Sequence, residues 1–460
     1  MLLEGALYMQ KAEFKMSMDI CDNYDVIVAG GGPAGCAAAA SAAREGAKTL
    51  LIEASYMLGG MGTGGLVPSW SPFSDNEKII YRGMAEKILN SAKAQSPHIM
   101  PQDLTWVPID SEVLKRVYDD FINEYGVDVL FGTQLCSVNT DGAGNVTGIL
   151  VSNKSGLKVY RAKVYADCTG DADLAAWAGA EFEHGGENGT LMPASLCFVI
   201  TNVDEYAYRY DHNSGLCFGT MQGTNPKSAI HAIAADKDFP LVTDTHLCHQ
   251  IIGPGTVGFN AGHIFSVDST DPVSVSKAMM KGRELAHQLH EGLKKYFPSA
   301  FSNSLLVNTA PLMGIREGRR IKGDYTLTLE DYIGRRSFPD EISRNCYYID
   351  VHLTKEETDA ARAQGISREQ LNMRYKKGES HGIPYRSLLP KGLTNVIVAG
   401  RSISCDRKIQ GSVRVMPNCL CTGEAAGLAA AIAAWNDRNV HNVDVDALRS
   451  RLREYGAYFL

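Results

Sequence analysis

The stretch that decides the fold is YDVIVAGGGPAG, at residues 24–35. Its first six residues form a short apolar run, which is typical of a buried parallel strand. A glycine cluster follows, and residues 36–43 are nearly all alanine, the strongest helix former. A second apolar run, TLLIE at residues 49–53, ends in an acidic residue. The pattern therefore predicts a strand, a tight turn, a helix and a second strand, the order of a dinucleotide-binding unit.

The glycines of this unit meet separate physical requirements. Gly30 permits the turn, Gly32 lets a pyrophosphate approach the backbone, and Gly35 lets the helix pack closely on the strand. The phosphate would then face the free N–H groups at the helix N-terminus. Glu53 ends the second strand, where its carboxylate can accept hydrogen bonds from both ribose hydroxyls. The candidate residues for the nucleotide are Gly30, Gly32, Pro33, Ala34, Gly35 and Glu53.

A second glycine pattern, GPGTVG at residues 253–258, also fits G-x-G-x-x-G. The segment after it, at residues 259–263, is not helix-forming, and no strand ending in an acid follows at the right distance. We interpret it as a turn and expect no second nucleotide-binding unit.

The composition limits the possible classes. The chain has 460 residues, 45% of them hydrophobic and 21% charged, which is typical of a globular protein of more than one lobe. Its formal net charge of −7 and the lack of basic runs argue against a nucleic-acid partner. The eleven cysteines are scattered without a C-x-x-C pair, so no metal or dithiol motif is indicated. Reduced cysteines favour a cytoplasmic location.

The order of elements predicts two interleaved lobes. Short strand-like segments between residues 127 and 168 indicate a β-meander, and the α/β alternation is lost beyond residue 180. An apolar strand returns at residues 395–400 and precedes an Ala/Gly-rich helix at 417–435. The longest apolar stretch is too short to span a membrane. The predicted divisions are a discontinuous dinucleotide-binding domain at 22–180 and 391–440, an inserted domain at 181–390, and a flexible tail at 1–21.

Further segments carry a family resemblance. They are LGGMGTGG at 58–65, VYADCTGD at 164–171, VIVAGR at 396–401 with Asp406 beyond it, GSVRVMP at 411–417, and GEAAG at 423–427. Together with the glycine turn, they resemble the FAD-dependent oxidoreductase family of the glutathione-reductase-like and fumarate-reductase-like flavoprotein superfamily. The resemblance covers roughly residues 24–435. It implies an α/β fold: a Rossmann-type FAD-binding lobe, with a parallel sheet and β-meander, carrying an inserted α+β substrate lobe.

The resemblance also implies noncovalent FAD and a set of contacts to it. The glycine stretch passes near the ribityl chain or the ring, the Thr-Gly-Asp segment lies on the pyrophosphate side, and Asp406 bonds the ribityl–phosphate region. The helix near Pro417 faces the pyrimidine end, where its positive dipole end stabilises reduced flavin. The further cofactor-binding candidates are Gly60, Met61, Gly62, Thr169, Gly170, Asp171, Asp406, Val415 and Asn418.

Candidates for the chemistry lie in two clusters. Arg316, Arg319 and Arg320 could clamp a carboxylate or stabilise an oxyanion, or they could form structural ion pairs. His381 and Tyr385 are proton-transfer types close together in the sequence. We take Arg316, Arg320, His381 and Tyr385 as the catalytic candidates. Asn260 and His263, after the second glycine pattern, and Arg401 are further candidates for the same cleft.

The predicted function is hydride exchange between flavin N5 and a small organic substrate. The reaction is oxidation at CH–OH or CH–NH, or reduction of a C=C bond. Two alternatives stay open: a flavin monooxygenase, and a non-catalytic flavin-binding partner subunit. The electron donor or acceptor is unidentified, and a homo-oligomer is compatible with the sequence.

Overall fold

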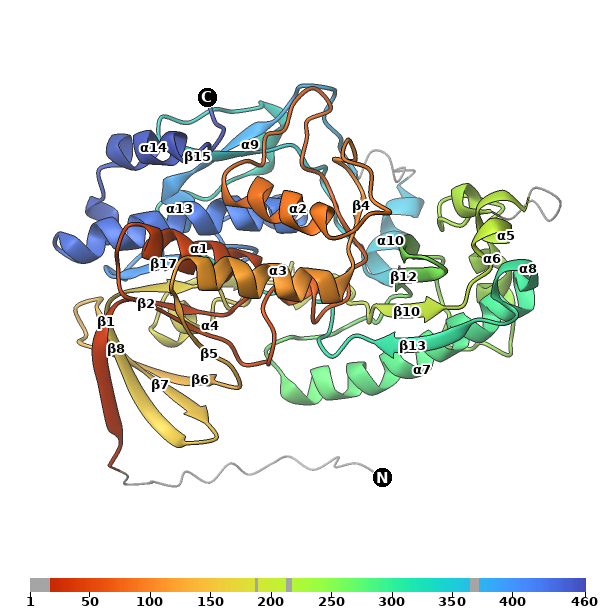
Figure 1. The fold of residues 1–460 in the computed structure, drawn as a ribbon, viewed down its shortest axis with the longest axis horizontal. Coiled ribbons are helices and arrows are strands. Elements are labelled where there is room, and N and C mark those ends of the chain that lie inside the picture. The colour runs from red at the N-terminus through yellow and green to blue at the C-terminus, as the bar shows by residue number, and fades with distance from the viewer. Residues whose placement is uncertain (1–16, 187–188, 212–216, 365–371) are drawn as a thin grey trace.

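The computed structural model describes residues 17–186, 189–211, 217–364 and 372–460. A seven-stranded sheet lies in the larger of two lobes, with the strand order β5-β2-β1-β8-β7-β6 and with β17 beside β8 (Figure 1). The strands are β1 (Asp19–Ala29), β2 (Thr49–Ile52), β5 (Asp128–Leu130), β6 (Gln134–Thr140), β7 (Val146–Asn153), β8 (Gly156–Asp167) and β17 (Val396–Val398).

The sheet combines a parallel part with a meander. Strands β5, β2, β1, β8 and β17 run parallel, because β1 pairs with both β2 and β8 in that sense. Strands β6, β7 and β8 are antiparallel and connected by short turns. The first part of β8 pairs with β7 and its last residues pair with β17, so one long strand joins the meander to the parallel sheet. This confirms the predicted α/β class with a parallel sheet and β-meander.

Two helices pack against each other beside the sheet, α1 (Pro33–Arg44) and α13 (Met416–Trp435), as Figure 1 shows. They approach closely because α13 presents Gly423 and Gly427, where any added Cβ would overlap the backbone of Ala34 and Ala38. Both helices are buried along most of their length. The same hydrophobic cluster includes α2 (Met84–Ala94), α3 (Ser111–Glu124) and α14 (Val445–Glu454). A short antiparallel pair of strands, β3 (Ser69–Trp70) and β4 (Val107–Pro108), lies against them.

The smaller lobe is built on a four-stranded antiparallel sheet with the order β11-β12-β10-β13. Its strands are β10 (Phe198–Thr201), β11 (Leu247–Gly253), β12 (Thr256–Ala261) and β13 (Leu305–Thr309). Its helices are α5 (Glu205–Tyr210), α6 (Ala229–Ala235), α7 (Pro272–Tyr296) and α8 (Pro298–Phe301). The glycine pattern at residues 253–258 forms the turn between β11 and β12, so the structure confirms that it opens no nucleotide-binding helix.

The hydrophobic clusters divide the chain differently from the predicted lobes. The second cluster covers residues 194–313 together with Leu66, whereas buried residues between 327 and 389 join the large cluster around α1 and α13. These residues surround an antiparallel pair of strands, β15 (Glu341–Asn345) and β16 (His381–Pro384), of which β15 packs against α13 and α14. The remaining elements are α4 (Asp173–Trp177), β9 (Phe182–His184), β14 (Arg319–Ile321), α9 (Leu329–Ile333), β15 (Glu341–Asn345), α10 (Lys355–Ala363), β16 (His381–Pro384) and α12 (Arg407–Val413).

The predicted N-terminal tail is shorter than expected. Residues 19–21 belong to β1, where Asp19 pairs with Lys158 of β8, because the long meander strand offers a free edge there. The rest of the prediction, residues 1–16, lies outside the described residues.

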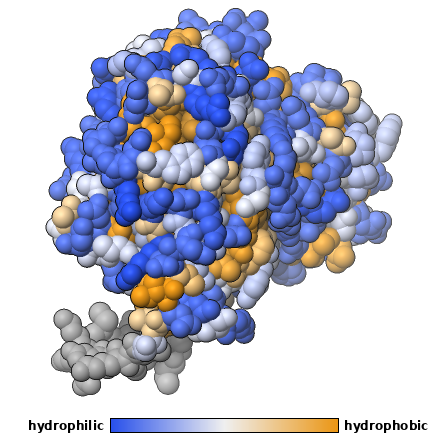
Figure 2. Space-filling view, turned by 60° about the vertical axis from the view of Figure 1, so that its left-hand side comes forward, coloured by the Kyte–Doolittle hydropathy of each residue, from blue (hydrophilic) through white to orange (hydrophobic). Residues whose placement is uncertain are grey.

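The surface of the protein is mostly hydrophilic on the face that Figure 2 draws. Figure 2 shows one face, on which hydrophilic residues cover most of the surface and hydrophobic residues gather in separate patches. Within the described ranges, no single helix has the length and apolar composition needed to cross a bilayer. Helices α12 and α13, bent by 92° at their junction, satisfy that test only when taken together.

Candidate active site

A cleft opens where β1, β2, β8 and β17 end, at the carboxyl edge of the parallel sheet. Gly30 makes the turn after β1 with a φ of 94°, which glycine adopts readily. At Gly32 an added Cβ would meet no atom within 4 Å, so this backbone faces open space. At Gly35 it would overlap the carbonyl oxygen of Gly30. The three glycines thus serve the turn, the open approach and the close packing that the motif predicts.

Glu53 is held in place by the backbone beside the cleft. The N–H of Gly31 donates to its Oε2 at 2.6 Å and the N–H of Ser55 donates to its Oε1 at 2.7 Å. These bonds orient the carboxylate at the end of β2, where it lines the cleft. Each oxygen keeps a further lone pair for another donor.

Most of the predicted cofactor residues line this cleft. They are Gly30, Gly32, Pro33, Ala34, Glu53, Gly60, Met61, Thr169, Gly170 and Asp171. Their contact with the cofactor stays a prediction, but they all face one continuous space.

Asp406 does not line the cleft, which corrects its predicted role. It is the N-cap of α12 and accepts the N–H of Ile409 at 2.8 Å, while its other oxygen accepts the N–H of Leu329 at 2.6 Å. The chain turns away after β17 to begin this helix. Arg401, directly after the strand, lines the cleft instead.

The other four predicted residues do not line the cleft either: Gly35 packs against Gly30, as described above, and the remaining three have different positions. Gly62 is buried, and a Cβ there would press on Leu114. Val415 lines a second cavity rather than the cleft. Asn418 is fully buried in the first turn of α13, where its Nδ2 donates to the carbonyl of Val413 at 2.8 Å. Its Oδ1 is buried and finds no hydrogen-bond partner among the described residues.

The second cavity adjoins the cleft. The residues that line both are Met61, Ile315, Arg401, Arg414 and Met416. Met416 is the first residue of α13, whose N-terminus carries no side-chain cap. Arg401 is paired with Asp171 at 3.0 Å and Arg414 with Asp350 at 3.1 Å. The positive helix end therefore lies beside two ion pairs at this junction and favours negative charge there.

Arg316 is the one member of the arginine cluster that lines the second cavity. Its guanidinium donates to the carbonyl of Pro193 at 2.8 Å, to Ser195 Oγ at 3.0 Å and to Asn260 Oδ1 at 3.2 Å. Its side chain is buried, and among the described residues no carboxylate lies within 4.0 Å of it. Burial lowers the pKa of Arg316 from its ordinary value. The cavity therefore contains a desolvated cation held only by neutral oxygens.

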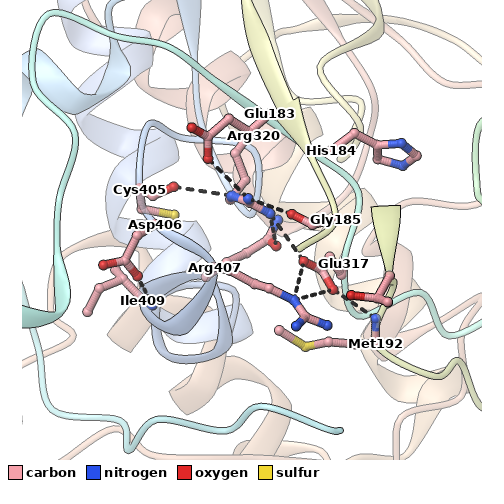
Figure 3. A network of polar contacts seen from close by, with 12 residues as sticks. Glu183, His184, Gly185, Met192, Glu317, Arg320, Cys405, Asp406, Arg407 and Ile409 are labelled. Carbon is pink, nitrogen blue, oxygen red and sulfur yellow. Dashed lines mark hydrogen bonds and ion pairs between the residues drawn. The ribbon is translucent and has the colours of Figure 1, made fainter. Parts of the chain in front are cut away.

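Arg320 and Arg319 are structural, which corrects the catalytic prediction for Arg320. Figure 3 shows Arg320 inside a polar network, where it contacts Glu317 at 3.2 Å and Glu183 at 3.3 Å. Arg407 contacts the same Glu317 at 3.0 Å. Arg319 pairs with Asp173 at 2.7 Å. Both arginines lie in β14, where successive side chains point to opposite faces and so reach different carboxylates.

Tyr385 belongs to the large hydrophobic cluster and His381 packs against Tyr332 of that cluster. Neither residue lines either cavity, so their predicted catalytic roles are also corrected. His381 is fully buried, with Nδ1 at 3.1 Å from the hydroxyl of Tyr375, and burial lowers its pKa to about 3. The Tyr385 hydroxyl donates to the carbonyl of Val440 at 2.7 Å. Each side chain therefore joins its own segment to another one, His381 to Tyr375 and Tyr385 to Val440.

Sequence reasoning missed the polar residues opposite Arg316: His246, Tyr347, Asp350, His352 and Arg414. Burial alone would raise the pKa of Asp350, but His352, Arg414 and Arg316 hold it well below its ordinary range. Burial and the nearby Arg316 lower the pKa of His352 to about 3. The available signal was a histidine and an aspartate two positions apart in an otherwise apolar segment, which alone does not indicate a site.

The cleft fits a dinucleotide by the chemistry of its donors. The N-terminus of α1 has Gly32 as N-cap and no side-chain cap, so its first N–H groups remain for a phosphate. Glu53 supplies an acceptor that lines the cleft beside the turn, and the N-terminus of α13 lies at the far junction.

Comparison with known proteins agrees with this geometry. Residues 25–452 match the family described as FAD dependent oxidoreductase. Digeranylgeranylglycerophospholipid reductase of Picrophilus torridus is 30% identical over 167 residues, which are 34% of this chain and 42% of that protein. The matched stretch therefore spans less than half of that relative.

Two solved structures show low similarity. A geranylgeranyl bacteriochlorophyll reductase-like protein of Thermoplasma acidophilum has a TM-score of 0.44 and 13% identity, covering 96% of this chain and 93% of that one. The flavin-dependent brominase Bmp2 has a TM-score of 0.46 and 14% identity, covering 94% and 83%. The identification rests on the family match and on the cleft: the chain belongs to the FAD dependent oxidoreductase family, and its cofactor is FAD.

Proposed function

We propose that this enzyme exchanges a hydride between its flavin and a small organic anion bound beside Arg316. The observation that carries the proposal is the buried guanidinium of Arg316, whose hydrogen bonds within the described part of the chain go to neutral oxygens, in a cavity that shares lining residues with the FAD cleft. Asp350 of the same cavity interacts with this charge through space but forms no ion-pair contact with it, and a buried charge without a contacting counter-ion is unfavourable. A carboxylate on the substrate would supply that counter-ion and could accept two parallel N–H bonds from the guanidinium.

The surrounding residues support this assignment. Ser195 and Asn260 fix the guanidinium plane, so the charge is oriented before the anion arrives. When bound, FAD supplies a hydride acceptor or donor at N5. The N-terminus of α13 and Arg414 stabilise the negative charge that develops at the junction of the cleft and the cavity. Oxidation at CH–OH or CH–NH and reduction of a C=C bond both fit this arrangement.

The superfamily is part of the same proposal. The strand, glycine turn, helix and acid-terminated strand support membership of the glutathione-reductase-like and fumarate-reductase-like flavoproteins.

The test is an anaerobic screen of small carboxylates and their uncharged esters or amides, followed by the visible absorbance of the flavin. We expect the acids to reduce the oxidised enzyme, or to reoxidise the reduced enzyme, and the neutral analogues to react poorly. Arg316→Lys should slow that step by roughly 10²–10³ while FAD content is retained, because lysine lacks the planar fork.

The matched control is Arg319→Lys, which changes a neighbouring arginine that is paired with Asp173 and lines neither cavity. Normal reduction by Arg316→Lys, or equal reactivity of acids and neutral analogues, would show that Arg316 is not the anion site.

A further inference from the structure

Three histidines converge at the edge of the second cavity from three separate segments. His246 directly precedes β11 and His263 follows β12, so the two ends of one hairpin bring them together. The N–H of Gly262 donates to the carbonyl of His246 at 2.9 Å and fixes this approach. His352 comes from the chain after β15, in the larger lobe. One ring nitrogen of each histidine lies within 4.8 Å of those of the other two.

The nitrogens of His263 and His352 face each other closely. His263 Nε2 lies 2.9 Å from His352 Nδ1. The ring of His246 stacks on that of His263, with 4.2 Å between centroids. Two of the rings are therefore stacked, and the third faces His263 edge-on with one nitrogen.

The outer nitrogens of two rings face carboxylates. His263 Nδ1 lies 3.4 Å from Asp244 Oδ1, and His352 Nε2 lies 3.4 Å from Asp350 Oδ1. A carboxylate accepts hydrogen bonds, so its position favours the tautomer in which these outer nitrogens carry the N–H. In that tautomer both inner nitrogens are acceptors 2.9 Å apart, which is the arrangement of two ligands of one cation; in the other tautomer one ring donates a hydrogen bond to its neighbour.

We propose that His246, His263 and His352 bind one divalent transition-metal ion of the class that Zn²⁺ represents. Imidazole nitrogen suits this class, and a carboxylate behind a histidine is the usual second contact that fixes its tautomer. At Zn–N distances of about 2.0–2.1 Å, tetrahedral ligand nitrogens lie roughly 3.3 Å apart, so the facing pair needs to separate by only a few tenths of an ångström.

The alternative to a metal is a proton shared between His263 and His352. The two differ in metal content, because a shared proton leaves no ion in the purified protein and a bound metal does. The carboxylates of Asp244 and Asp350 offset the charge of the nearby arginines, and Arg414 contacts Asp350 at 3.1 Å.

The two carboxylates behind the histidines are held in place by further hydrogen bonds. Asp244 also accepts the backbone N–H of His246 at 2.7 Å and of His263 at 3.2 Å. Asp350 also accepts a hydrogen bond from the hydroxyl of Tyr347 at 3.2 Å.

With two ligands from the smaller lobe and one from the larger, the ion would join the lobes. His246 and His352 line the cavity, so a fourth coordination position would open toward it. None of this depends on the role of Arg316.

The experiment uses the full chain with FAD bound, stripped with a chelator, incubated with excess Zn²⁺, desalted and analysed for metal by mass spectrometry. We expect about one Zn²⁺ per chain, and a loss of roughly tenfold or more in His263→Ala and in His352→Ala, because a two-histidine remnant holds zinc weakly. The control is His231→Ala, which removes an exposed histidine of α6 and should keep the full metal content.

Thermal unfolding gives a second readout on the wild-type protein itself. The chelator should lower the melting temperature and Zn²⁺ should restore it, whereas the histidine variants should respond to neither. The proposal is overturned if the wild type retains no Zn²⁺, which would indicate the shared proton, or if folded His263→Ala and His352→Ala retain as much as the control. FAD content, measured in parallel, reports on the separate cleft.

Discussion

Replacing Glu53 with alanine should weaken both the glycine turn and the binding of FAD. The carboxylate accepts the N–H groups of Gly31 at 2.6 Å and Ser55 at 2.7 Å, so it connects the end of β2 to the turn after β1. Hydrogen bonds to a charged group contribute about 1.5–3 kcal/mol each. Both hydrogen bonds are partly exposed, so water can replace part of their contribution in the variant. We therefore expect the free energy of unfolding to fall by about 3 kcal/mol.

The effect on FAD is separate and additional. Losing the acceptor for the ribose hydroxyls should cost about 1–3 kcal/mol of binding free energy, which is a roughly 5- to 160-fold rise in Kd. Glu53→Gln keeps one amide oxygen as an acceptor but places N–H donors against a backbone donor. It should therefore fall between the wild type and Glu53→Ala in both measurements.

The assay is FAD titration of the apoprotein by flavin fluorescence, with urea unfolding of the same samples. The control is Glu454→Ala, which removes an exposed glutamate paired with Arg451 and should change stability by less than about 0.5 kcal/mol. An unchanged Kd for Glu53→Ala would mean that the ribose partner lies elsewhere. An unchanged unfolding free energy would mean that the two backbone bonds do not stabilise the turn.

Three further results are expected. Gly35→Ala should abolish FAD retention and lower the expression of folded protein, because the new Cβ would overlap the carbonyl oxygen of Gly30. The measurement is the flavin bound after purification, and full retention would contradict the close packing of Gly35 on Gly30. Burial lowers the pKa of His249 to about 4, so the folded state binds fewer protons than the unfolded state and stability is lost as pH falls from about 6.5 toward 4. Between pH 7 and pH 5 this contributes about 2 kcal/mol, and His249→Gln should reduce the difference in urea unfolding by that amount. Arg320→Met should lower the free energy of unfolding by about 3–5 kcal/mol, because it leaves the buried Glu317 without one of its two cations. A variant with normal stability and a catalytic defect would make Arg320 a catalytic candidate again.

The sequence by itself determined the features that depend on near neighbours. The glycine turn at residues 30–35, the helix after it and the acid at the end of β2 follow from backbone sterics and from a repeat of apolar residues, all within one supersecondary unit. The same local reasoning separated the second glycine pattern at residues 253–258, because no helix follows it. Five of the residues predicted in this way line one cleft, and five that the family resemblance implied line it too.

Only the tertiary structure decided which polar side chains face that cleft and its neighbouring cavity. Arg316, Arg319 and Arg320 are alike in sequence, yet the carboxylates that neutralise Arg319 and the Glu183 that contacts Arg320 lie more than a hundred positions away. Asp406 follows the right strand but caps α12, and the three histidines come from segments with no common pattern. A charge interacts through space with whichever element packs against it, and that partner is set by the folding of distant segments, which local periodicity does not record.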